Sequence, residues 1–187
     1  MKYTALTLSF FALFIILQNT SCTRGNKYLK EIQMLDSMQT FITKADSAVK
    51  AIDSAKITGY VHQVEKVDGM IQMEHADSMS PGASSIVRSF NAVRWSLASI
   101  AGKRGPLLRE LEKSQAQMKH LSHDLHDNLV NKDSVSYYVA FETKKASELV
   151  EVSNFSVATM NQEIPVYNLL QPKADSLMSL LKDHKKF

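Results

Sequence analysis

The sequence predicts an all-α protein, an antiparallel bundle of five to six amphipathic helices in a single domain that spans residues 28–187. Three observations support this fold class. Apolar residues recur every three to four positions along most of the chain, which gathers them on one face of a helix. Glycine, proline and capping residues interrupt the pattern at intervals. No stretch of useful length alternates apolar and polar residues as a strand would.

The first helix is expected over about residues 26–53 and the second from about residue 57. The first helix carries two interleaved apolar series with a step of seven, which is typical of a helix packed along one face. These series are Tyr28, Leu35, Ile42, Val49 and Met38, Ala45, Ile52. The next series, Ile57, Tyr60, Val64, Val67 and Ile71, is out of phase with them. We therefore expect a break or bend near residues 54–59.

A turn at residues 102–106 is predicted to separate the third helix from the fourth. Ser80 and Pro81 are expected to open the third helix, with Ser80 as its N-cap. Gly102 would end that helix and Pro106 would open the next, because glycine favours helix ends and proline favours first turns.

A second break, at residues 131–134, is predicted to separate the fourth helix from the fifth. The fifth helix is expected to run from Val135 to about Ile164, since Pro165 follows, and a short last helix would start at Pro165 or Pro172. Seven residues of the apolar stripes are expected inside the bundle: Leu35, Ile42, Phe90, Leu97, Leu111, Leu125 and Leu149.

The first 22 residues have the parts of a secretory signal. Lys2 supplies a positive charge, residues 3–17 carry none, and small and polar residues lead to Cys22, the single cysteine of the chain. The apolar run over residues 3–17 is shorter than the ~20 residues that a helix needs to cross a bilayer. We therefore expect a cleaved signal and not a permanent membrane span.

This segment resembles the signal of bacterial lipoproteins, over residues 1–22 only. Thr20 and Ser21 match the small residues before the modified cysteine, and Cys22 matches the cysteine itself, whereas Asn19 replaces the usual aliphatic residue. The resemblance implies that residues 1–21 are removed and that Cys22 carries the lipid, followed by a tether over residues 22–27. The alternative is an ordinary secretory signal with a chance cysteine near the cut.

The expected location is the bacterial cell envelope, with the lipid anchor in the outer membrane and the protein facing the periplasm. Residues 23–27 contain no acidic run of the kind that directs some lipoproteins to the outer surface, and Thr23 is not the Asp linked to inner-membrane retention. The net charge of +3 comes from interspersed acidic and basic residues, so no concentrated basic face for nucleic acid is expected.

A histidine-rich segment suggests one candidate metal site. On a helix His120, His123 and Asp127 share one face, opposite the apolar stripe, and would bind zinc or copper if a neighbouring helix supplied a further ligand. The alternative is a solvated polar face. The sequence has no HExxH motif or cysteine pair, so we expect no metal and no other cofactor.

Glu142 is a second candidate, because it lies between Val139 and Ala146 in the middle of an apolar stripe. A carboxylate in that position either serves a site inside the bundle or is paired with a facing residue or with solvent.

Trp95 is a candidate partner contact, with Arg88 nearby. It lies opposite the apolar stripe of its helix, so it is either an exposed contact residue or buried in a helix that is covered on both sides.

These features favour a membrane-tethered periplasmic lipoprotein that acts as a non-enzymatic binding or scaffold module for a further envelope protein or a small ligand. No nucleophile, carboxylate pair or nucleotide-binding loop is apparent, so an enzyme is the less favoured class. The alternative function is a metal-binding or catalytic bundle that uses the His/Asp face or an internal Glu142.

Lipidation at Cys22 is the first testable prediction. Intact-mass analysis of the membrane fraction should show a chain that begins at Cys22 and carries acyl groups, because two or more acyl chains are needed for stable anchoring. The Cys22→Ser variant should lose both the added mass and the membrane association. An unmodified chain that begins at another residue, and is unaffected by Cys22→Ser, would contradict the prediction.

Overall fold

The computed structural model describes residues 26–75 and 79–184, and every regular element in these ranges is helical. The elements are α2 (Leu29–Lys50), α3 (Ser54–His75), α4 (Pro81–His126), a short 3₁₀ turn η1 (Lys132–Ser134) and α5 (Val135–His184). None of these helices is long and apolar enough to cross a membrane.

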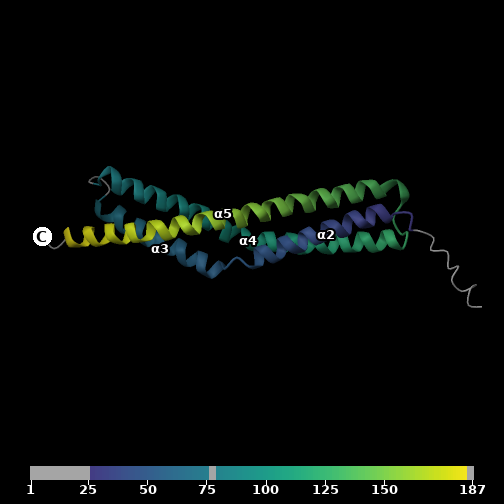
Figure 1. Cartoon of the computed structure of the whole chain (residues 1–187), viewed down its shortest axis with the longest axis horizontal. Helices are drawn as coiled ribbons and strands as arrows, with labels where there is room; N and C mark the ends of the chain where they lie inside the picture. The colour runs from purple at the N-terminus through teal and green to yellow at the C-terminus, as the bar shows by residue number, and fades with distance from the viewer. Residues whose placement is uncertain (1–25, 76–78, 185–187) are drawn as a thin grey trace, which may run out of the picture.

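The molecule is an elongated bundle built on two long helices, α4 and α5, which pack against each other (Figure 1). The shorter helices α2 and α3 follow one another along this pair, and each packs on both α4 and α5. The chain direction of α4 is opposite to that of α2, α3 and α5. The bundle is therefore three helices thick, with its first helix divided in two.

The division falls at residues 51–53, slightly before the predicted position. Ile52 is buried in this break, so the chain leaves α2 without leaving the core. The Asp53 side chain then accepts a hydrogen bond from the backbone N–H of Lys56 at 3.0 Å, which satisfies one of the free donors in the first turn of α3.

The predicted turn at residues 102–106 is wrong, because α4 passes through it without a break. Gly102 and Gly105 both have negative φ, as in the rest of the helix, and the exposed Pro106 removes only one backbone donor. The apolar stripe stays in phase across the segment, since Leu97, Ile100, Leu107 and Leu111 are all buried. Burial of this continuous face outweighs the local preference of glycine and proline for a turn.

Arg104 adds a tertiary contact at the same place. Its guanidinium donates hydrogen bonds to the carbonyl oxygens of Val49 (3.1 Å) and Lys50 (3.0 Å), at the carboxyl end of α2. These carbonyls have no partner within α2, so the side chain both caps that helix and fixes the middle of α4 against it.

The predicted end of the fifth helix near Ile164 is also wrong, since α5 continues through Pro165 and Pro172 to residue 184. Both prolines are exposed, while Tyr167 and Ala174 remain in phase on the buried face. The described residues therefore form four α-helices instead of the predicted five to six.

The predicted core is largely confirmed. Leu35, Ile42, Leu97, Leu111 and Leu125 are 0% exposed, Phe90 is 2% exposed, and Leu149 is partly buried against the same cluster.

Aromatic residues fill the part of the core under α3. The Tyr167 ring of α5 packs against Tyr60 of α3 and Phe90 of α4, with ring centroids 4.2 and 5.4 Å away. The Tyr167 hydroxyl donates to Oε1 of Gln63 at 2.5 Å, and burial raises the pKa of Tyr167 to about 12. One side chain thus joins all three helices at this level.

The Leu125→Ala substitution should lower the free energy of unfolding by roughly 2–5 kcal/mol, because Leu125 is fully buried and its loss leaves a cavity. Leu129→Ala is the matched control: this residue is 70% exposed, so its change should stay within about 0.5 kcal/mol. Urea denaturation measures both. Equal effects of the two substitutions would contradict the assignment of Leu125 to the core.

The free energy of unfolding should fall above pH 10 because of Tyr167. The unfolded chain loses the tyrosine proton near pH 10 and the folded chain only near 12, so the contribution of Tyr167 is complete below pH 10 and is lost as the pH rises toward 12. The loss should reach roughly 2–3 kcal/mol. In denaturation between pH 9 and 12, Tyr167→Phe should flatten this slope. A slope that is the same in Tyr167→Phe and in the wild type would contradict the prediction.

Candidate functional site

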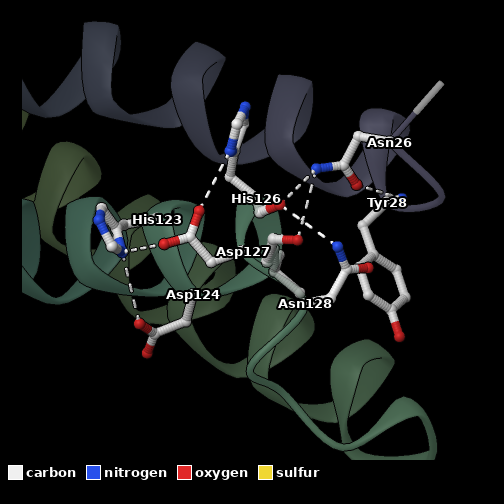
Figure 2. Close-up of polar contacts among 8 residues, drawn as sticks. Asn26, Tyr28, His123, Asp124, His126, Asp127 and Asn128 are labelled. Atoms are coloured by element: carbon white, nitrogen blue, oxygen red, sulfur yellow. Dashed lines mark hydrogen bonds and ion pairs between the residues drawn. The ribbon is translucent and has the colours of Figure 1, made fainter. Parts of the chain in front are cut away.

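The first described residue, Asn26, is held at one end of the bundle by the end of α4 (Figure 2). Its side-chain amide donates to the carbonyl oxygen of His126 at 3.2 Å and lies 3.5 Å from that of Leu125. Its Oδ1 accepts from the backbone N–H of Tyr28 at 2.9 Å. The predicted lipidation site, Cys22, lies outside the described residues, but the chain joins the bundle at this end only four residues later.

The same end of α4 is closed by a Schellman turn. Asn128 has a φ of 57°, the left-handed conformation that asparagine tolerates better than most residues. The N–H of Asn128 donates to the carbonyl of Leu125 (3.3 Å) and that of Leu129 to the carbonyl of Asp124 (2.8 Å). This turn redirects the chain at once, so residues 129–131 lie beside α4 instead of extending it.

A groove with a volume of about 700 Å³ lies where this turn meets α4 and α5. That volume is within the range of roughly 300–1,000 Å³ found for small-molecule sites. Its apolar wall includes Leu121, Leu129, Val130 and Tyr138. Its polar lining includes Lys113, Gln117, His120, Asp124, Asn131, Ser134 and Glu142.

Glu142 is the most unusual group in this groove. It projects from the face of α5 that also carries the buried Val139 and Ala146, and its Oε2 is buried with no hydrogen-bond partner among the described residues. The nearby Lys145 does not supply one: its Nζ lies 3.7 Å from Glu110 and 3.4 Å from Gln117 Oε1. A buried carboxylate oxygen left in this state is unfavourable until a donor reaches it.

The predicted His/Asp face is divided by the structure. His120 lines the groove with Glu142, whereas His123 is not part of the lining. His123 contacts Asp127 (3.6 Å) and Asp124 (3.8 Å), and of these only Asp124 also lines the groove (Figure 2). Among the side chains that the structure describes, no three histidine, aspartate or glutamate residues converge as metal ligands do.

Trp95 is exposed, which excludes the alternative in which its helix is covered on both sides. The indole is 68% exposed and stacks on the guanidinium of the neighbouring Arg94, 4.6 Å from the ring centroid. Arg88, also exposed, lies two turns earlier on α4, in the half of the bundle that α3 covers. Neither residue belongs to the groove.

Two features escaped the sequence analysis. Tyr138 and Leu129 match the apolar spacing of the sequence around them, but they are 46% and 70% exposed and line the groove. A second apolar series also follows the outer face of α5, where it is exposed: Tyr137, Phe141, Val152, Phe155, Val166, Leu169 and Leu180. Its helical spacing was readable in the sequence beside the buried series.

No protein-family model matches this chain, and no curated protein or solved structure is similar to it.

Proposed function

We propose that the chain is a lipid-anchored, non-enzymatic binding module of the bacterial cell envelope, which holds a small amphipathic molecule in the groove between α4 and α5. The observation that carries this proposal is the buried, unpaired Oε2 of Glu142 in a groove of ligand size. A buried polar group without a partner is often found in an empty binding site, where the bound ligand supplies the missing donor.

The lining indicates the chemistry of the ligand. A protonated primary or secondary amine would donate a hydrogen bond to Glu142, and its positive charge would offset the negative charge of the carboxylate. A neutral donor would supply only the hydrogen bond. The apolar wall formed by Leu121, Leu129, Val130 and Tyr138 would cover a short hydrocarbon or aromatic body. We therefore propose an amphipathic amine as the ligand class.

The position of the groove fits a membrane anchor. Asp124, Leu129 and Asn131 of the groove adjoin the helix end that binds Asn26. Four residue steps separate Asn26 from Cys22, which is at most about 14 Å of extended chain. A lipid on Cys22 would thus keep the groove close to the membrane surface, where amphipathic molecules are concentrated.

The role of Glu142 is tested with N-dansylcadaverine, a fluorescent primary amine, and with its N-acetylated form, which has no charge. The wild-type protein should bind the amine about ten- to a hundredfold more tightly than the acetylated form, as expected for a hydrogen bond to a charged group. Glu142→Gln should remove most of this difference. Fluorescence titration measures both affinities.

Glu112→Gln is the matched control, because Glu112 is an exposed carboxylate of α4 outside the groove lining. It should bind like the wild type. The proposed ligand class is wrong if the amine and its acetylated form bind equally. The groove itself is the wrong site if Leu129→Ala leaves the affinity for both probes unchanged.

A further inference from the structure

The outer face of α5 carries an exposed apolar strip that the bundle does not use. Four of its members lie within residues 137–155: Tyr137, Phe141, Val152 and Phe155, which are 66%, 53%, 47% and 71% exposed. At 100° per residue these positions fall on one side of the helix, opposite the buried face. Tyr137 and Phe141 already stack on each other, with centroids 6.2 Å apart.

Two opposite charges occupy the middle of this strip. Lys144 and Glu148 lie between the aromatic residues, with Nζ and Oε1 4.0 Å apart and side chains 80% and 65% exposed. A pair as exposed as this adds little stability to the monomer, so both charges remain available to a partner surface.

The central charges and the end aromatics of this strip are self-complementary when the helix is reversed. Consider two copies of α5 that run antiparallel, with the two-fold axis at the level of residue 146. A residue before position 146 in one copy then faces the residue at the same distance after position 146 in the other copy. Lys144 then faces Glu148 of the other copy, and Tyr137 faces Phe155. Phe141 faces the turn that carries Glu151 and Val152. Spacings of three and four residues place each layer in the alternating register of antiparallel paired helices.

We propose that α5 pairs antiparallel with α5 of a second copy of this chain, across the face from Tyr137 to Phe155. A second copy is favoured over an unrelated partner because the central charges and the end aromatics face matching groups after reversal, as a two-fold interface requires. A parallel arrangement would place Lys144 against Lys144 and Glu148 against Glu148, which repel each other.

The contact is short, about 28 Å along the helix, so we expect a reversible dimer in solution. Val166, Leu169 and Leu180 continue the strip beyond the contact and provide an internal comparison. The proposal does not depend on the groove or its ligand, because no residue of the strip lines the groove.

The charge register is tested by sedimentation equilibrium of residues 22–187 with Cys22→Ser in every sample. Lys144→Glu and Glu148→Lys should each weaken association by about tenfold or more, because each change occurs twice per dimer. An equimolar mixture of the two variants should restore it, since each Glu then faces a Lys. If neither single variant changes the association constant, the antiparallel register is wrong.

The extent of the contact is tested with a matched pair. Phe155→Ala should weaken association by at least about tenfold, whereas Leu169→Ala, at a 64% exposed site on the same face, should leave it within about twofold. Equal effects would overturn the proposed contact in favour of one along the whole strip. A wild-type chain that remains monomeric at about 100 μM would overturn self-association. Circular dichroism verifies the helix content of each variant, and rescue in the mixture excludes misfolding as the cause.

Discussion

The whole structure depends on the continuous burial of the apolar face of α4 against its neighbours. That face runs from Phe90 to Leu125 without losing phase, and α5 packs along it over the length of the bundle. Because the two long helices form one unbroken surface, α2 and α3 can each cover a part of it without contacting one another extensively. The break between α2 and α3 at residues 51–53 removes little buried apolar surface, because Ile52 within it still packs in the core.

The helical class, most of the buried residues and the break near residue 54 were predicted from periodicity, and the break near residue 131 was predicted from the local residues 131–134. The prediction failed where two signals competed. Gly102 and Pro106 indicated a turn, while Ile100, Leu107 and Leu111 kept their phase across it, and the phase proved decisive. Tertiary burial of several large side chains outweighs the cost of one lost backbone hydrogen bond and two glycines. The Arg104 contact with the end of α2, which also favours the continuous helix, is not visible in the sequence.

The candidate site was only partly predictable for a related reason. Glu142 stood out because a carboxylate interrupts an apolar stripe, and no other residue is needed to see that. The groove around it depends on where α4 ends, and that position is set by the left-handed Asn128 and the Schellman turn. An asparagine in a run of polar residues gives no clear sign of this conformation. His120, grouped by its spacing with His123, faces the groove because of the helix packing and not because of that spacing.

The two surfaces proposed on α5 touch at one point. Tyr138 lines the groove, and its ring lies against that of Tyr137 in an edge-on contact, with centroids 5.6 Å apart. Tyr137 belongs to the outer strip, where Phe155 of a second copy would cover it. Under the two proposals, a ligand in the groove and a second copy of the chain would therefore contact neighbouring rings of α5.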